Sequence, residues 1–203
     1  MILEDPDLGD CLCGVITDIT ELKQLNEKLG KIAYQDNITG LMNRAALDKS
    51  ITQYLDNFHS KQQEFALLYV DMNGLIVVND NYGHPVGDIL IQETGKRISS
   101  VLALKGEIAR VGGDEFMLLI PYYEQQEIIN ITEQILASLR EPIALAKTKL
   151  ALSASIGIAC CPADGHDVAT LVQHADSSMY EAKRISKGSY SFYKKRTLLS
   201  DKI

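Results

Sequence analysis

Tryptophan is absent from this 203-residue chain, and cysteine and proline are scarce. The four cysteines form two local pairs, Cys11/Cys13 and Cys160/Cys161, and neither pair has the two-residue gap that is typical of a zinc knuckle. Reduced thiols therefore explain the cysteines better than a metal site does. No apolar run approaches the ~18 residues needed to span a membrane. The first residues also lack the basic and apolar regions of a signal peptide, so we expect a cytoplasmic chain or a cytoplasmic piece of a longer one.

Positive charge is also in short supply, since 20 Lys and Arg residues stand against 27 Asp and Glu residues and the formal net charge is −7. A protein whose main partner is a nucleic-acid duplex usually presents a basic face, so we expect no nucleic-acid partner. The charge does not exclude a nucleotide ligand, because a few lysines and a metal ion can hold a triphosphate. The apolar fraction of 46% predicts one full core plus an extension at this chain length.

Helices and strands alternate along the chain, and a hairpin lies in the middle of the alternation. The expected strands cover residues 11–16, 65–71, 107–111, 115–120, 150–160 and 190–193, and the expected helices cover residues 21–34, 44–57, 74–81, 86–104, 125–140 and 168–186. This order predicts a mixed α/β (α+β) fold with a largely antiparallel central sheet flanked by helices, instead of a doubly wound parallel sheet.

Three carboxylates are placed where they can meet. Asp71 ends an apolar strand, and Asp114 and Glu115 lie at the tip of the expected hairpin. If the hairpin pairs beside that strand, all three side chains reach one rim of the sheet. Clustered carboxylates suit Mg²⁺ or Mn²⁺, which usually also take substrate phosphates as ligands. Each acid taken alone would be interpreted as part of an exposed turn or a helix cap.

Three glycines accompany these acids. Gly112 and Gly113 have no Cβ, so a nucleotide can approach the hairpin turn closely. Gly74 follows Asp71 at the junction of a strand and a helix, where free N–H groups form a natural phosphate cradle. The combination predicts a site for a phosphorylated ligand and a divalent cation.

The order of motifs resembles that of the GGDEF family of diguanylate cyclases, from about Gln35 to Tyr193. Seven segments carry the resemblance: residues 36–44 (DNITGLMNR), Asp71, residues 79–80 (ND), 83–88 (GHPVGD), 110–116 (RVGGDEF), 155–159 (SIGIA) and 175–183 (ADSSMYEAK). Seven separated segments in family order are far more specific than a lone motif. The resemblance implies a nucleotidyl-cyclase-like fold with a ferredoxin-like core and a catalytic β-hairpin.

The resemblance also implies an activity, in which two GTP molecules are joined into cyclic di-GMP and pyrophosphate is released. Each domain would bind one GTP, and two domains would meet face to face in a homodimer. Asp71, Glu115 and the backbone of Met72 match the ligands of Mg²⁺ or Mn²⁺. Asp114 is either a further ligand or the group that receives the 3′-hydroxyl proton. The chemistry would be two-metal phosphoryl transfer.

The GTP-binding residues that the resemblance implies serve the base and the phosphates. Asn79 and Asp88 match residues that hydrogen-bond guanine, and helix capping is the alternative role for both. Lys183 and Lys187 match basic residues that hold the terminal phosphates, and their spacing of four predicts one helical face. The other implied GTP-binding positions are Gly74, Leu75, Gly112 and Gly113.

Departures from the family pattern bear on turnover and on feedback. Ile76 stands where a Lys contacts the β- and γ-phosphates, and Lys187 stands where Arg is frequent, so phosphate contacts are weakened. Many members bind their product at an Arg-x-x-Asp motif just before the hairpin. The aligned residues here are Ala103 and Gly106, which cannot supply charge-assisted contacts, so we expect no product-inhibition site.

The N-terminal part carries a shorter resemblance. Residues 14–20 (GVITDIT) look like the last strand and exit motif of a PAS sensor domain, and Thr20 is a plausible cap of the following helix. An apolar stripe on that helix is either a docked face or a dimer seam: Leu22, Leu25, Leu29 and Ile32. The expected division is a PAS-like remnant at 1–20, a linker helix at 21–34, a GGDEF domain at 35–195 and a tail at 196–203. It suggests an upstream sensor and a downstream phosphodiesterase domain as partners.

Three functions stay open at the level of the sequence. The leading one is an active, metal-dependent diguanylate cyclase. The second is a catalytically weak or degenerate GTP-binding module that regulates an attached or partner phosphodiesterase, and Ile76 favours it. The third is a pure dimerisation unit without nucleotide affinity.

Overall fold

The computed structural model describes residues 2–5, 9–12, 17–103, 105–122, 124–145 and 148–194. The chain divides into two compact units, one up to Ile32 and the other from Ala33 onwards. No helix within the described ranges is both long and apolar enough to cross a bilayer.

The first unit begins with a two-stranded hairpin. Strand β1 (Ile2–Asp5) pairs antiparallel with β2 (Gly9–Leu12), and helix α1 (Thr20–Tyr34) follows. The strand expected at 11–16 is wrong in its start, because residues 11 and 12 end a strand that begins at Gly9. Residues 13–16 lie outside the described residues, and with them part of the segment that looks like a PAS exit. The Thr20 N–H donates to Asp18 Oδ1 (2.9 Å), so the Asp18 carboxylate caps this helix start.

The second unit is built on a five-stranded sheet with the order β4-β5-β3-β8-β9. Strand β3 (Phe65–Met72) is central and pairs antiparallel with β5 (Glu115–Pro121) and β8 (Ala154–Cys161). β4 (Glu107–Arg110) pairs antiparallel with β5, and β9 (Tyr190–Phe192) pairs parallel with β8. The predicted mixed, largely antiparallel sheet is confirmed. All eight residues of β3 are buried, as a continuous apolar run in a central strand predicts.

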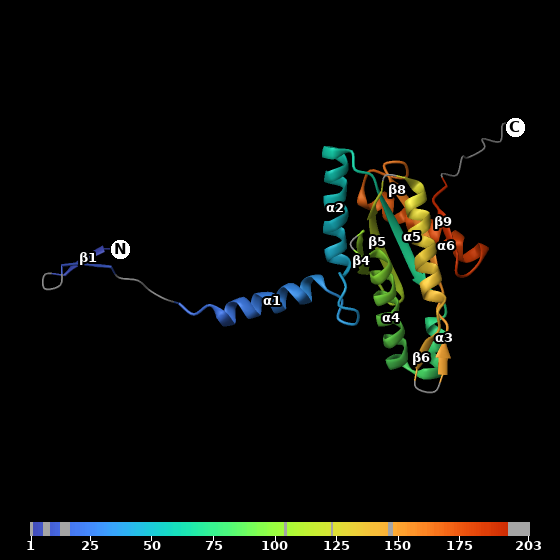
Figure 1. Ribbon diagram of the computed structural model, residues 1–203, viewed down its shortest axis with the longest axis horizontal. Coiled ribbons are helices and arrows are strands. Elements are labelled where there is room, and N and C mark those ends of the chain that lie inside the picture. The colour runs from blue at the N-terminus through green and yellow to red at the C-terminus, as the bar shows by residue number, and fades with distance from the viewer. Residues whose placement is uncertain are drawn as a thin grey trace. The chain divides into compact units, whose positions relative to one another are not determined.

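Helices cover both faces of this sheet (Figure 1). α4 (His84–Leu102) and α5 (Gln125–Arg140) contribute to a core that contains Leu68, Val70 and Phe116. α2 (Arg44–Lys61) and α6 (Val168–Ile185) contribute to a second core that contains Leu67 and Tyr69. Successive strand residues point to opposite faces, so each strand supplies both cores alternately.

The expected helix of residues 86–104 differs from the observed one at both ends. α4 begins at His84, because Gly83 (φ 83°) alone turns the chain from α3 (Leu75–Tyr82) into α4. Pro85 fits the first turn of α4, where a proline costs no helical hydrogen bond. Only Gly83 therefore separates the two helices, and the four residues between the expected helices 74–81 and 86–104 are not a separate loop.

The strand expected at 150–160 is interrupted. Its first residue belongs to β7 (Thr148–Leu150), which pairs with β6 (Ile143–Leu145) in a separate hairpin that the sequence analysis missed. β8 starts only at Ala154. The Ser153 carbonyl accepts a hydrogen bond from the Asn73 N–H (2.8 Å), which lies in the loop after β3.

Candidate active site

The register of the sheet brings the predicted carboxylates together. Asp71 lies directly opposite Glu115 in the β3–β5 pair, and the Met72 N–H donates to the Asp114 carbonyl (3.0 Å). Asp71 continues the alternation of Leu67 and Tyr69, so its side chain lies on the sheet face that α2 and α6 cover. The expected pairing of the hairpin beside this strand is confirmed.

A lysine from α6 meets this rim. Lys183 Nζ lies 2.7 Å from Asp71 Oδ2, and the Asp71 side chain is only 10% exposed. Burial raises the pKa of Asp71; the Lys183 ammonium opposes the rise, and the nearby Asp114 and Glu115 add to it. The rim therefore concentrates negative charge beside a single close ammonium group, among the residues described.

Gly112 lies close against the Glu115 side chain. The Val111 N–H donates to the Glu115 carbonyl (3.0 Å), which closes the hairpin turn. A Cβ at Gly112 would lie 2.5 Å from Glu115 Oε2, so any side chain there displaces the carboxylate. A Cβ at Gly113 meets no atom within 4 Å, which leaves the turn open to a ligand.

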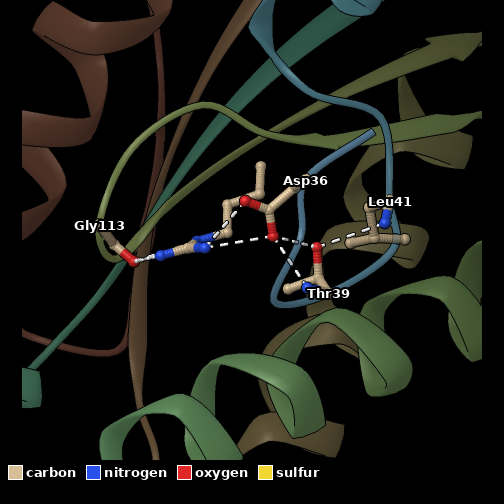
Figure 2. A network of polar contacts seen from close by, with 5 residues as sticks. Asp36, Thr39, Leu41 and Gly113 are labelled. Atoms are coloured by element: carbon tan, nitrogen blue, oxygen red, sulfur yellow. Dashed lines mark hydrogen bonds and ion pairs between the residues drawn. The ribbon is translucent and has the colours of Figure 1, made fainter. Parts of the chain in front are cut away.

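Arg110 ties this hairpin to the segment before α2, as Figure 2 shows for Asp36 and Gly113. Its guanidinium donates to both Asp36 carboxylate oxygens (3.1 and 2.9 Å) and, from Nε and Nη2, to the Gly113 carbonyl (3.2 and 2.9 Å). Asp36 also accepts from the Thr39 N–H (2.8 Å) and hydroxyl (2.7 Å), and that hydroxyl accepts from the Leu41 N–H (3.3 Å). Burial raises the pKa of Asp36, but the Thr39 and Arg110 hydrogen bonds together hold it below its ordinary value.

Sequence reasoning missed three functional candidates, the paired residues Asp36 and Arg110 and the single residue Tyr69. Asp36 and Arg110 lie within recognised motifs, but nothing local reveals that they pair across the fold. Tyr69 is the other omission: burial, followed by the charge of the nearby Glu115 carboxylate, raises the pKa of Tyr69. The only available signal for Tyr69 was its position two residues before Asp71, on the same face of the strand.

The residues expected to contact a base lie on either side of the Gly83 corner. Asn79 belongs to α3, and Asp88 belongs to α4 and is exposed. The alternative of Asp88 as an N-cap is wrong, because α4 starts four residues earlier. Asn79 Oδ1 is buried without a hydrogen-bond partner among the described residues, so the side chain caps no helix either.

The residues expected at the phosphates are only partly arranged as predicted. Gly74 (φ 87°) precedes α3, whose first residue is Leu75, so the expected strand-to-helix junction is present. Lys183 lies on α6, but the prediction that Lys187 shares its helical face is wrong. α6 ends at Ile185 because Ser186 is extended (φ −163°, ψ 128°), which carries Lys187 off the helix.

The sequence profile described as "Diguanylate cyclase, GGDEF domain" matches residues 33–189 of the chain. The chain belongs to the GGDEF domain family. Its fold and its Gly-Gly-Asp-Glu-Phe hairpin are those of a GGDEF domain, as the motif order predicts.

Relatives of this GGDEF domain include the bifunctional diguanylate cyclase/cyclic di-GMP phosphodiesterase MucR of Pseudomonas aeruginosa, which is 37% identical over 86% of the chain and 25% of MucR. The diguanylate cyclase TpbB of the same organism is 34% identical over 93% of the chain and 45% of TpbB. The chain thus spans a quarter to under a half of these curated relatives. A solved structure of the GGDEF domain of TpbB superposes with a TM-score of 0.77 at 32% identity, covering 79% of this chain and 95% of that one.

The oxygen donors of this GGDEF domain suit a divalent cation only in part. Within the described ranges, no group of three or more His, Cys, Asp or Glu side chains is arranged to hold a metal ion. Asp71 and Glu115 form an opposed pair, and Mg²⁺ is commonly bound by one or two carboxylates together with waters and substrate phosphates. The residues present therefore fit an ion that arrives with a triphosphate better than an all-protein cage.

The positions aligned with the family's product site are unlike a binding site. Ala103 ends α4 with φ 47° and carries only a methyl group. A Cβ at Gly106 would lie 2.5 Å from the backbone carbonyl oxygen of Leu119, so this GGDEF domain has no room for an acidic side chain there.

Proposed function

We propose that this chain is a diguanylate cyclase that condenses two GTP molecules into cyclic di-GMP. The 3′-oxygen of each GTP attacks the α-phosphorus of the other, so two phosphodiester bonds form, two pyrophosphates leave and two protons are released. The observation that carries the proposal is the register that sets Asp71 opposite Glu115 at the hairpin, with Lys183 2.7 Å from Asp71.

Asp71, Glu115 and the Met72 backbone would hold Mg²⁺ or Mn²⁺, since all three offer oxygen donors. Such an ion supplies charge stabilisation at the reacting phosphate and the leaving pyrophosphate. Asp114 is either a further ligand or the acceptor of the 3′-hydroxyl proton. The Tyr69 hydroxyl, which lies close to the Glu115 carboxylate, would orient this acid toward the rim.

The substrate would be bound at two ends. Asn79 and Asp88 hydrogen-bond guanine, and Lys183, Lys187 and the backbone at Gly74 and Leu75 contact the phosphates. Gly112 and Gly113 line the approach at the hairpin, where Gly113 has open space. Because Lys187 lies off α6, it reaches the phosphates from the loop before β9.

Catalysis needs two copies, because each domain carries one GTP. A stripe on α1 suits this pairing: Leu22, Leu25, Leu29 and Ile32 recur at spacings of three and four and are 54–77% exposed. A stripe with this period is the seam of a two-stranded coiled coil. We propose a homodimer in which α1 pairs with its copy, with a sensor before it and a phosphodiesterase domain after it in the whole protein.

Incubation with GTP and Mg²⁺ tests the proposal directly. The wild-type chain should release pyrophosphate and form cyclic di-GMP, with a rate per protomer that rises with protein concentration. Glu115→Ala should abolish the product, while Glu124→Ala, which removes an exposed acid at the start of α5, should keep it. Absence of product from the wild-type chain at high concentration would refute the proposal.

A second function is favoured by one observation. Ile76 is 72% exposed at the first turn of α3, where the family pattern has a phosphate-binding lysine. The phosphates of GTP therefore lack one positively charged contact at this position. The alternative is a GTP-binding module that regulates an attached or partner phosphodiesterase. GTP binding without product, together with GTP-dependent activation of such a phosphodiesterase, would support it.

A further inference from the structure

Asn79 and Gly87 are joined through a single residue at the corner between α3 and α4. The Gly83 N–H donates to the Asn79 carbonyl (2.8 Å), and the Gly83 carbonyl accepts from the Gly87 N–H (3.4 Å). Gly83 has φ 83°, a conformation that a residue with a side chain rarely adopts. The corner therefore fixes the backbone of Asn79 against the backbone of Gly87.

The Asn79 side chain occupies the space that a side chain at position 87 would fill. A Cβ built on Gly87 would lie 1.9 Å from Asn79 Oδ1, 3.0 Å from Cγ and 3.4 Å from Nδ2. All three of its nearest atoms belong to Asn79. Gly87 itself is buried, so this contact is part of the interior of the α3–α4 corner.

The buried position of the Asn79 amide is unfavourable in free energy, and packing alone does not explain it. Asn79 Oδ1 is buried and has no hydrogen-bond partner among the described residues. A buried polar atom without a partner is unfavourable, and a role in binding a ligand is one reason for a native structure to keep such an atom. With the carbonyl end over Gly87, the amide nitrogen is the end left to donate to a ligand.

We infer that Gly87 is a positioning residue for guanine recognition. Because Gly87 has no side chain, it leaves the space that holds and orients the Asn79 amide. The inference rests on the proposed binding of GTP. An amide donor from Asn79 suits the O6 acceptor of guanine, where adenine presents an amino donor. The Asp88 carboxylate, one residue beyond Gly87, offers only acceptors, which suit the N1–H and amino groups of guanine.

The test is a double-mutant cycle on binding, with 3′-deoxy-GTP as the probe. This nucleotide lacks the attacking hydroxyl, so its dissociation constant is measured by isothermal titration without turnover. Gly87→Ala and Asn79→Ala should each weaken binding about tenfold, the effect of one lost hydrogen bond. The double variant should bind as Asn79→Ala does, because both changes remove the same contact. The affinity for 3′-deoxy-ATP should change little, so discrimination between the two nucleotides narrows.

The melting temperature of the Gly87→Ala variant distinguishes a positioning role of Gly87 from a general packing defect. Gly87→Ala displaces only Asn79, so its melting temperature should stay near that of the wild type; if it falls, the double variant should recover it, since Asn79→Ala removes all three clashing atoms. Gly30→Ala is the matched control, because a Cβ there meets nothing within 4 Å in helix α1. It should leave binding unchanged and should not lower the melting temperature, because alanine is a better helix former than glycine.

Several outcomes would overturn the inference: unchanged 3′-deoxy-GTP binding by Gly87→Ala, effects of the two substitutions that multiply in the double variant, or a loss of folding that Asn79→Ala does not reverse. A wild-type chain that binds 3′-deoxy-GTP but forms no cyclic di-GMP from GTP refutes the proposed turnover alone. A wild-type chain that binds no guanine nucleotide refutes both.

Discussion

Among single residues, Asp71 shows how neighbours set the ionisation of a site. Burial raises its pKa, while Lys183 at 2.7 Å limits the rise. The folded state thus binds the Asp71 proton more tightly than the unfolded state does. The free energy of unfolding consequently falls as the pH rises from the ordinary Asp value of 3.8 through the raised pKa.

Replacing Lys183 with Met should enlarge this effect. The Asp71 carboxylate then loses its close ammonium partner, its pKa rises further, and the chain loses about 1–3 kcal/mol of unfolding free energy at pH 7.5. The loss should be smaller near pH 4, because the raised pKa of Asp71 favours its protonated form in acid. Urea denaturation at the two pH values measures the difference. Lys96→Met, which removes an exposed lysine of α4, is the control, and an equal loss in both variants would contradict the prediction.

Ala103 and Gly106 lead to a prediction about feedback. Neither residue can hold a phosphate or a guanine through charge-assisted contacts, so cyclic di-GMP should not inhibit the chain through these positions. Initial rates of pyrophosphate release should be the same with and without added cyclic di-GMP. Tight binding in isothermal titration that substitution at Ala103 or Gly106 weakens would show that the prediction is wrong.

Among the structural elements, the hairpin between β4 and β5 depends on a contact from outside the sheet. Arg110 bonds the Gly113 carbonyl and the Asp36 carboxylate at once, and both paired side chains are 15% exposed or less. The segment before α2 therefore supports the turn that carries Asp114 and Glu115. Because the pKa of Asp36 is lowered, its contribution to stability is present above pH 3.8 and is lost as the pH falls through the lowered value.

Arg110→Met should cost about 1.5–3 kcal/mol of unfolding free energy at neutral pH, since two charge-assisted contacts are lost. Turnover should fall about tenfold or more, because small displacements of catalytic groups strongly reduce the reaction rate. Urea denaturation and product formation are the measurements. The control is Arg184→Met, which breaks an exposed pair with Glu181 and should cost at most about 0.5 kcal/mol. Equal effects of the two substitutions would contradict the role of Arg110.

For the whole molecule, activity should depend on assembly. Leu25→Glu with Leu29→Glu places two like charges on the exposed stripe of α1, so the two copies should separate. Sedimentation should then show a monomer at concentrations where the wild type is dimeric, and turnover per protomer should fall in parallel. Gln24→Glu adds a charge outside the stripe and should leave both unchanged. A double variant that stays dimeric and fully active would refute pairing of the two copies through the α1 stripe.

Much of the second unit could be predicted from the sequence because its signals are local. The buried run of β3 and the Gly-Gly turn each depend on a few adjacent residues. The β6–β7 hairpin was missed because its strands have three residues each, which is too short for a clear period. The end of α6 was misplaced because Lys187 continues the helical spacing although Ser186 leaves the helix.

The family, the order of the elements and the identity of the carboxylates could be inferred before folding was considered, because motifs and hydrophobic periods lie in neighbouring residues. Which of those residues touch one another depends on the three-dimensional fold. Four contacts join distant segments or separate elements: the register of Asp71 with Glu115, the Lys183–Asp71 ion pair, the Asp36–Arg110 ion pair and the packing of Asn79 against Gly87. Such contacts follow from how strands align and helices pack, and no local pattern encodes the distance between two side chains.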